Sequence, residues 1–323
     1  MTPAAGASIL DLLIGELTER YVFPERARRA AELLSVRNAQ GAYDGASGAE
    51  LCARISQDLF EACADKHLRL IWHEAPIASA DEAELVARMR EQIRLENHGV
   101  RRVEVLPGNV GLVELTIIPE ASSGTPALTA AMRLVEHTDA LIFDLRETRG
   151  GSPDGVVLLT SYLFADGDVH LTDFFEGPCG PPRQFWTYAH LPGPRYLDRA
   201  VYVLTSSSTF SGGEAFAYDL QVHARATVVG EVTRGGAHPS MMVPLSDQIE
   251  LRLPVARPVS AVTGGNWEGV GVIPDVLEVA ANALDVALDL HREQRSARSR
   301  REEGLADEVV GPGGRQFEAP RSR

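Results

Sequence analysis

One short segment of the sequence concentrates groups that could form and break covalent bonds. The stretch TSSSTFSGGEAFAY, residues 205–218, holds four serines, two adjacent glycines and a glutamate. A serine hydroxyl attacks a carbonyl carbon when a neighbouring base takes its proton and backbone amides stabilise the oxyanion. Ser211 and Glu214 also match S-x-x-E, the capping box that opens a helix. The two interpretations are compatible, because a serine at a helix N-terminus lies in a positive potential that favours an oxyanion.

A serine nucleophile needs a base, and nine histidines could supply it. His67, in ACADKHLRL, lies where a predicted helix passes into a strand, and His238, in RGGAHPS, lies in a loop after a strand. Residue chemistry alone favours neither, and a structural role is the ordinary expectation for each. The fifty residues after Ser211 contain no lysine that could replace histidine. The elbow motif G-x-S-x-G fails because residue 209 is threonine, and neither a P-loop nor a G-x-G-x-x-G fingerprint occurs.

Two predicted strands end in loops that could bring these groups together. ALIFDLR (140–146) and AVYVLTS (200–206) are apolar runs typical of strands covered on both faces. Each precedes a glycine-containing loop and a helix, and ATVVGE (226–231) is a third such strand. This alternation predicts right-handed crossovers and a parallel sheet. Because ligands bind at the carboxyl ends of such strands, we expect the loops 147–155 and 207–213 to be neighbours.

The first part of the chain predicts helices rather than strands. Apolar side chains in SILDLLIGELTERYVF recur on one helical stripe, and Pro24 opens a second helix where proline is tolerated. GAELCARISQDLFEACA is a third helical segment. KHLRLIWHEA alternates like a strand, DEAELVARMREQIRLEN predicts a further helix, and GVRRVEVLPGNVGLVELTII predicts two strands around a Pro-Gly-Asn turn.

Composition limits the classes of function. The 323 residues are 44% apolar, enough for a large core, and the formal net charge is −14. An acidic chain without a basic stripe argues against nucleic acid and anionic membranes as partners. Cys52, Cys63 and Cys179 form no C-x-x-C pair, so we expect neither a metal site nor a disulfide. No signal peptide or run of 18 apolar residues is recognised, which favours a cytoplasmic protein.

Several separated motifs resemble the tail-specific, or C-terminal processing, serine peptidases. They are ERYVFPERARRAAELL, DKHLRL, VEVLPGNVGLVEL, ALIFDLRETRGGSP, VYVLTSSSTFSGGEAFAYDLQ, ATVVGEVTRGGAHP and GGNWEGVGVIPDV. They follow family order over roughly residues 8–290. The likeness is closest to the branch of the interphotoreceptor-retinoid-binding-protein-like peptidases and the tricorn core. This resemblance implies that the nucleophile is Ser211, that the histidine base is His67 in DKHLRL, and that the third member is Glu268 in NWEGVGV.

The resemblance also implies an oxyanion hole and shows two departures from the family pattern. The hole would use the amide of Gly212 and that of Gly150 or Gly151. Thr148 stands where the family loop has asparagine, so loop shape or substrate reach could differ. Gly236 stands where the Ser-Lys peptidases have lysine, so we do not expect a Ser-Lys dyad.

Together these observations predict an α/β (α+β) protein. We expect an N-terminal helical domain (1–75), a crotonase-like ββα/βαβ sheet domain (76–290) without a PDZ insertion, and a disordered charged tail (291–323). The expected function is a serine-type peptidase, a hydrolase acting on peptide or unfolded-protein substrates without cofactor or metal, with homo-oligomerisation left open. One alternative is a binding protein for retinoids or fatty acids with a vestigial triad, and another is acyl transfer on an ester.

Overall fold

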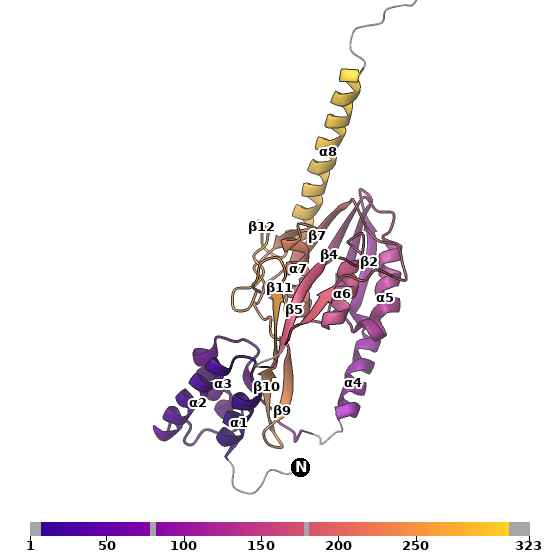
Figure 1. Ribbon diagram of the computed structural model, residues 1–323. Coiled ribbons are helices and arrows are strands. Elements are labelled where there is room, and N and C mark those ends of the chain that lie inside the picture. The colour runs from indigo at the N-terminus through magenta and orange to yellow at the C-terminus, as the bar shows by residue number, and fades with distance from the viewer. Residues whose placement is uncertain (1–7, 78–81, 178–180, 310–323) are drawn as a thin grey trace, which may run out of the picture.

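The structure is a computed structural model that describes residues 8–77, 82–177 and 181–309, so Cys179 lies outside the described part. Figure 1 shows the N-terminal helices at one end of the molecule and the largest sheet with its covering helices above them. A narrow β-ribbon lies between these two parts. The candidate site residues come from both parts, so the contact between the two parts determines the geometry of the site.

The N-terminal part consists of the three predicted helices. They are α1 (Ile9–Arg20), α2 (Pro24–Ala39) and α3 (Gly48–Cys63). The Ser8 hydroxyl accepts a hydrogen bond from the Asp11 amide and so caps α1, and Pro24 occupies the first turn of α2. Each helix buries an apolar stripe against the others, which includes the fully buried Leu13 and Leu17. Burial of each such leucine contributes about 1.5–3 kcal/mol.

Strands from distant parts of the chain complete this helical core. β1 (Arg69–Trp72) pairs antiparallel with β10 (Ile249–Pro254), which pairs antiparallel with β9 (Ser240–Pro244). Leu251 and Leu253 of β10 point into the helical core. The helical unit expected for residues 1–75 is therefore closed by strands that lie about 170 residues further along the chain.

The larger part is built on a six-stranded sheet. Its spatial order is β12 (Val276–Leu277), β8 (Thr227–Gly230), β7 (Ala200–Thr205), β4 (Ala140–Asp144), β3 (Val110–Leu115) and β2 (Val100–Leu106). The pairs from β3 to β12 are parallel, and β2 pairs antiparallel with β3 in the hairpin that the sequence predicts. The parallel sheet expected from the strand–helix alternation is confirmed.

Helices cover both faces of this sheet, which explains why its central strands are apolar on both sides. One face packs against α5 (Ala121–Leu134), α6 (Pro153–Ser161) and α7 (Gly212–Val222). The other face packs against α8 (Ala283–Val309), through Ala283 and Ala287. In β4, alternate residues go to the two cores, with Phe143 on the α7 side and Ile142 on the α8 side.

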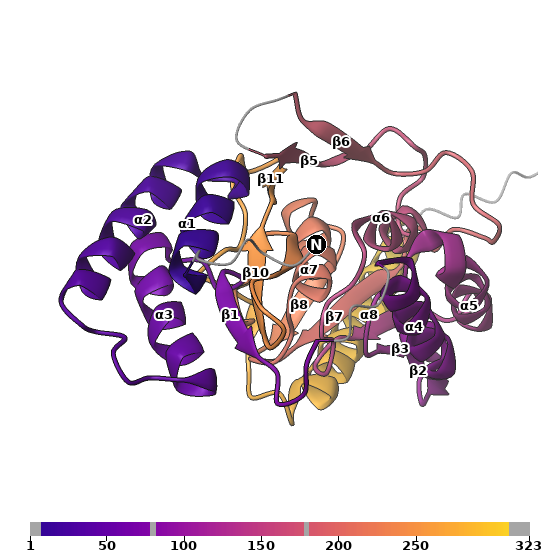
Figure 2. The same ribbon diagram turned by 90° about the horizontal axis from the view of Figure 1, so that it is seen from below.

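The remaining elements lie outside these two sheets. β11 (Ala256–Ser260), β5 (His170–Glu176) and β6 (Arg183–Trp186) form a third sheet, seen at the upper edge of Figure 2. α4 (Glu82–Leu95) and the short 3₁₀ helix η1 (Asn97–Gly99) lead from the helical part into β2.

The C-terminal region differs from its prediction. Residues 291–309 continue α8 as regular helix, where the sequence analysis assigned a disordered charged tail. The segment has no proline, and its one glycine, Gly304, lies near the helix end, so its many charged residues do not prevent helix formation. Residues 310–323 lie outside the described part. Of the helices that the structure describes, none has both the length and the apolar character needed to cross a membrane.

Candidate active site

The two loops expected to be neighbours do lie side by side, because β4 and β7 are adjacent parallel strands. The Phe210 amide donates to the Thr148 carbonyl at 3.1 Å, and the Thr209 hydroxyl donates to the Leu145 carbonyl at 2.8 Å. These bonds tie the end of one loop to the other. They fix the backbone immediately before Ser211, the N-cap residue of α7.

Ser211 has an unusual backbone conformation. Its φ of 53° and ψ of −116° lie outside the regions that a serine ordinarily occupies. The Ser211 amide donates to the Glu214 carboxylate at 2.8 Å, and Glu214 is fully buried. The same carboxylate accepts hydrogen bonds from the Thr233 hydroxyl and the amides of Gly235 and Gly236. Glu214 therefore holds Ser211 in its strained conformation and connects it to the loop after β8.

Three glycine amides near Ser211 lack partners. Among the residues that the structure describes, the amides of Gly150, Gly151 and Gly212 donate to no backbone or side-chain acceptor. The three residues are closely packed: a Cβ on Gly212 would lie 2.6 Å from the Gly151 nitrogen, and a Cβ on Gly150 would lie 3.3 Å from the Ser211 Cβ. Such unpaired donors, next to a serine at a helix N-terminus, are suited to stabilising an oxyanion.

His67 contacts the aromatic ring of Phe210. Its ring stacks on the Phe210 ring with 4.8 Å between centroids, and Phe210 directly precedes Ser211. His67 is 1% exposed, and burial lowers its pKa to about 3, with a further contribution from the Arg252 charge. Its Nδ1 has no hydrogen-bond partner and lies 4.0 Å from Oε2 of Glu268. At neutral pH His67 is therefore an uncharged imidazole that can accept a proton.

Glu268 is held by backbone amides. Its Oε1 accepts from the Lys66 amide at 3.1 Å, and its Oε2 accepts from the Ala237 amide. Burial raises the pKa of Glu268, and the neighbouring Asp65 charge adds to this effect. Glu268 thus connects the loop that carries His67 to the loop after β8.

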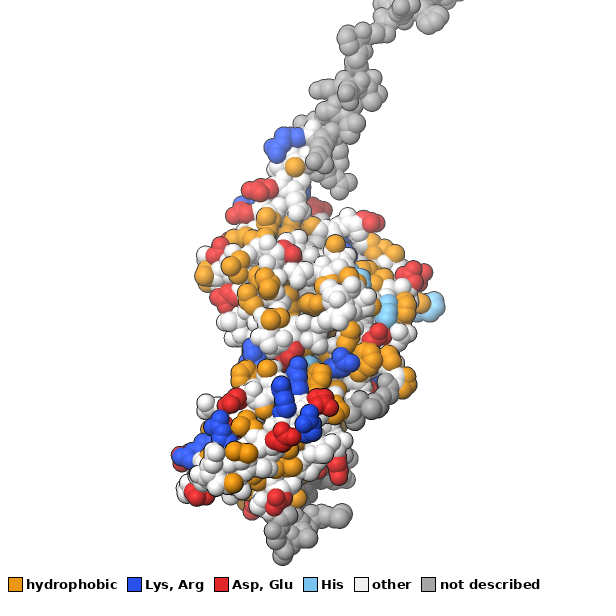
Figure 3. Space-filling view, turned by 60° about the vertical axis from the view of Figure 1, so that its left-hand side comes forward, with side chains coloured by type: hydrophobic (Ala, Val, Ile, Leu, Met, Phe, Trp, Pro, Cys, Tyr) orange, Lys and Arg blue, Asp and Glu red, His pale blue; other side chains and the backbone are white. Residues whose placement is uncertain are grey.

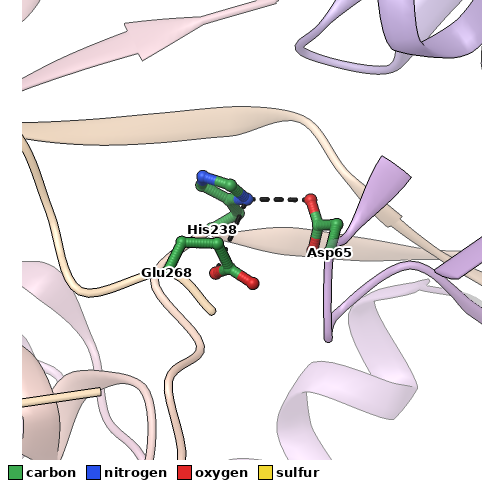
Figure 4. Close-up of side chains that lie close together, drawn as sticks. All are labelled: Asp65, His238 and Glu268. Carbon is green, nitrogen blue, oxygen red and sulfur yellow. Dashed lines mark hydrogen bonds and ion pairs between the residues drawn. The ribbon is translucent and has the colours of Figure 1, made fainter. Parts of the chain in front are cut away.

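A second histidine lies beside Glu268, as Figure 4 shows. His238 Nδ1 lies 2.8 Å from Oδ2 of Asp65 and 3.6 Å from Oε2 of Glu268. Burial acts to raise the pKa of Asp65, but its interaction with His238, together with hydrogen bonds from the His67 amide and the Tyr21 hydroxyl, holds that pKa below its usual value. Donor atoms of Asp65, His238 and Glu268 all lie within 4.8 Å of one another, so this trio is the cluster that could hold a metal ion.

The structure also accounts for Gly236. A Cβ at this position would lie 2.2 Å from the Phe210 ring and 2.7 Å from Cε1 of His67. The space that the lysine of a Ser-Lys dyad would need is thus filled by these two rings. The packing that buries His67 against Phe210 therefore also excludes a lysine at position 236.

The departure at Thr148 has a structural role. The Thr148 side chain is fully buried, and its hydroxyl donates to the Leu115 carbonyl at 2.6 Å, so it ties the loop to the end of β3. The next residue, Arg149, pairs with Glu96. Neither side chain contacts Ser211 through a hydrogen bond or ion pair.

Sequence reasoning missed two residues that shape the site. Asp65 bonds to the His67 amide at 3.0 Å, to His238 and to the Tyr21 hydroxyl, and its signal was its place two residues before His67 in DKHLRL. The ring of Phe210, the residue before Ser211, stacks on the ring of His67. Nothing in the segment TSSSTFSGGEAFAY indicates that this ring contacts His67.

Comparison with known proteins identifies relatives. Residues 109–277, more than half of the chain, match the model of peptidase family S41. The carboxyl-terminal-processing peptidase 2, chloroplastic, of Arabidopsis thaliana is 26% identical over 62% of this chain and 39% of that protein. The carboxy-terminal-processing protease of Bartonella bacilliformis is 25% identical over 53% of this chain and 39% of its own. The chain thus spans about two fifths of the length of these relatives.

Solved structures show the same fold at lower identity. A structure from Parabacteroides merdae has a TM-score of 0.62 at 18% identity, covering 88% of this chain and 95% of that one. The photosystem II D1 C-terminal processing protease has a TM-score of 0.50 at 16% identity, covering 85% and 94%. The tricorn protease has a TM-score of 0.53 at 13% identity, covering 89% of this chain and 36% of that one.

Proposed function

Because the chain belongs to peptidase family S41, we propose that it hydrolyses peptide bonds with Ser211 as nucleophile, His67 as base and Glu268 as the carboxylate that stabilises the imidazolium. The observation that carries this proposal is the set of unpaired glycine amides around a strained serine at the N-terminus of α7. A serine whose role was only to cap the helix would need neither the strain nor the free donors.

The chemistry assigns each group a step. The Ser211 Oγ attacks the scissile carbonyl carbon while Nε2 of His67 takes its proton, and the carbonyl oxygen becomes an oxyanion. The amide of Gly212, with that of Gly150 or Gly151, stabilises this oxyanion, and each such donor contributes about 3 kcal/mol. The intermediate then collapses, and the leaving amine takes the proton from His67. Water, activated by the same histidine, hydrolyses the acyl-enzyme.

Glu268 is suited to orient His67 because its carboxylate is fixed by two backbone amides. The 4.0 Å between its Oε2 and Nδ1 of His67 closes to a hydrogen bond with about 1 Å of movement. A positive charge on the imidazole during catalysis provides the attraction for this movement. His238, anchored by Asp65, is proposed to support Glu268 rather than to act on the serine.

A fluorophosphonate probe, which labels only activated serines, tests the assignment. The variants are Ser211→Ala, His67→Ala and His238→Ala, each checked for folding by thermal unfolding. We expect wild-type labelling, loss of labelling in the first two variants, and slower labelling in His238→Ala. Folded wild type that does not label would refute the peptidase proposal and favour the apolar-ligand binding protein. Labelling that survives in His67→Ala but not in His238→Ala would make His238 the base.

A further inference from the structure

Two arginines lie side by side next to the candidate base. Arg69 of β1 and Arg252 of β10 are register partners, so their Cβ atoms are about 5 Å apart on the same face of the sheet. The alternation along β10 buries Leu251 and Leu253 against the helices and leaves Arg252 half-buried on the opposite face. Arg69 follows His67 by two residues.

A third arginine reaches the same region from the loop after β8. The Arg234 guanidinium lies 4.8 Å from the centroid of the Phe210 ring, whose other neighbour is the ring of His67. The Lys66 ammonium donates to the Arg234 carbonyl and adds a further positive charge. Arg234 thus contacts the Phe210 ring, which in turn stacks on the ring of His67.

These arginines have no carboxylate partner. Within the described part of the chain, Arg69, Arg234 and Arg252 form no ion pair, and the Arg252 side chain makes one hydrogen bond, from Nε to the Ser240 hydroxyl. Glu250, on the same face of the sheet, pairs with His73 at 2.8 Å instead.

The electrostatic state of the cluster agrees with this geometry. Burial lowers the pKa of Arg252, the charges of Arg69 and Arg234 lower it further, and the Asp65 charge offsets part of this effect. Burial and the Arg234 charge likewise lower the pKa of Arg69. Clustered like charges that form no direct ion pair are unfavourable in a partly desolvated setting.

The cluster contrasts with arginines elsewhere in a chain whose net charge is −14. On the N-terminal helices, Arg28 pairs with Glu25 and Arg54 pairs with Glu50. Figure 3 shows Lys and Arg side chains interspersed with Asp and Glu over that part of the surface. Several arginines elsewhere that lack a carboxylate partner, such as Arg199 and Arg225, donate to backbone carbonyls instead. Within the described part of the chain, the side chains of Arg69 and Arg234 donate no hydrogen bond, which leaves them available to an external anion.

We propose that Arg69, Arg234 and Arg252 form a subsite that binds a carboxylate of the peptide substrate next to Ser211. The proposal rests on the proposed peptidase function and narrows its substrate class to peptides with a negative charge near the scissile bond. Guanidinium groups bind carboxylates through paired, charge-assisted hydrogen bonds. The carboxylate could belong to an acidic side chain or to the C-terminus of a short peptide, and the experiment separates these sources.

The test measures binding rather than turnover. Fluorescent peptides in matched pairs, Glu against Gln and free C-terminal carboxylate against amide, are titrated into the Ser211→Ala variant and followed by anisotropy. We expect one charged member to bind about tenfold or more tighter than its neutral match. A preference for Glu assigns the acidic side chain, and a preference for the free carboxylate assigns the terminus. The preference should disappear when Arg69→Gln and Arg252→Gln are added, and also with the exposed Arg234→Gln alone.

The control is Arg101→Gln, which removes an arginine paired with Glu114 on the other side of the molecule and should leave the preference intact. Equal binding of charged and neutral peptides, or a preference that survives loss of the arginines, would overturn the subsite. Fluorophosphonate labelling of the same variants with Ser211 intact keeps the two proposals separable. If the protein is labelled but shows no carboxylate preference, the subsite proposal alone is refuted. If the wild type is not labelled, the peptidase proposal is refuted.

Discussion

At the scale of single residues, burial sets the chemistry of His67. An imidazole in water has a pKa near 6.5, whereas enclosure lowers the pKa of His67 to about 3. A base works only in its neutral form, so its activity is lost as the pH falls through the folded-state pKa. The depressed pKa therefore extends activity into acid rather than confining it to neutral pH.

We accordingly expect kcat/KM on a fluorogenic peptide to change by less than about twofold between pH 7.5 and 5.5, where a base of pKa 6.5 would lose about tenfold. In the unfolded chain His67 takes up a proton below about pH 6.5, whereas in the folded protein it stays neutral down to about pH 3. The free energy of unfolding therefore decreases as the pH falls from about 6.5 toward 3. Unfolding must therefore be followed at each pH. An activity midpoint near 6.5 in fully folded protein would mean that a different or exposed histidine is the base.

Residue chemistry could be read from the sequence only in part. The serine-rich segment and its capping pattern indicated Ser211 and Glu214, and the family resemblance led to His67 and Glu268. The sequence alone could not distinguish His67 from His238, since both are buried beside the same carboxylate, Glu268. The structure distinguishes them because His67 stacks on Phe210, the residue before Ser211, whereas His238 bonds to Asp65, and these contacts form only when distant segments pack together.

At the scale of elements, the start of α7 packs closely against the loop after β4 because glycines, which have no side chain, lie at the contact. A Cβ on Gly212 would lie 2.6 Å from the nitrogen of Gly151 and 2.8 Å from its Cα. These are backbone atoms, which cannot move aside as easily as the end of a flexible side chain. We expect Gly212→Ala to lower the rate of fluorophosphonate labelling about 100-fold, because the donors separate. The unfolding free energy should fall by about 1–3 kcal/mol.

The matched control for this change is Gly15→Ala on α1, where no atom lies within 4 Å of the added Cβ. It should stabilise the protein by about 0.5–1 kcal/mol, because alanine is the better helix former, and leave labelling unchanged. Labelling of Gly212→Ala at the wild-type rate would exclude this junction from the oxyanion hole.

Most elements with a local signal were predicted, with β10 as the exception. The helices at the N-terminus, the β2–β3 hairpin and the strands β4, β7 and β8 all carry periodic or apolar patterns. The sequence analysis assigned no strands to residues 170–186 or 240–260, where the structure has β5, β6, β9, β10 and β11. The β1–β10 and β5–β11 pairs join segments far apart in the sequence, so much of the stability of these strands comes from their partners. β10 alternates apolar and polar residues, a local pattern from which a strand could have been predicted.

At the scale of the whole molecule, the active site depends on contact between the helical part and the sheet part. Asp65 at the end of α3 bonds to His238, 173 positions away, and Lys66 bonds to Glu268, 202 positions away. A division of the chain at residue 75 separates these contacts, because the proposed base His67 belongs to one part and Ser211 to the other. In the proposed mechanism the two parts therefore act as one catalytic unit.

The hydroxyl of Tyr21 tests this dependence, since it joins the helical core to Asp65 at 3.0 Å. Tyr43 makes an equivalent bond to Asp58 at 2.6 Å within the helical core alone. Tyr21→Phe and Tyr43→Phe should each lower the unfolding free energy by about 1–3 kcal/mol, because each leaves a buried carboxylate with one donor fewer. Only Tyr21→Phe should also lower kcat/KM, by about fivefold, because Asp65 then holds the His67 amide and the His238 ring less firmly. Denaturant titration gives the first quantity and peptide hydrolysis the second. Equal activity in the two variants would mean that the helical part contributes stability and not the geometry of catalysis.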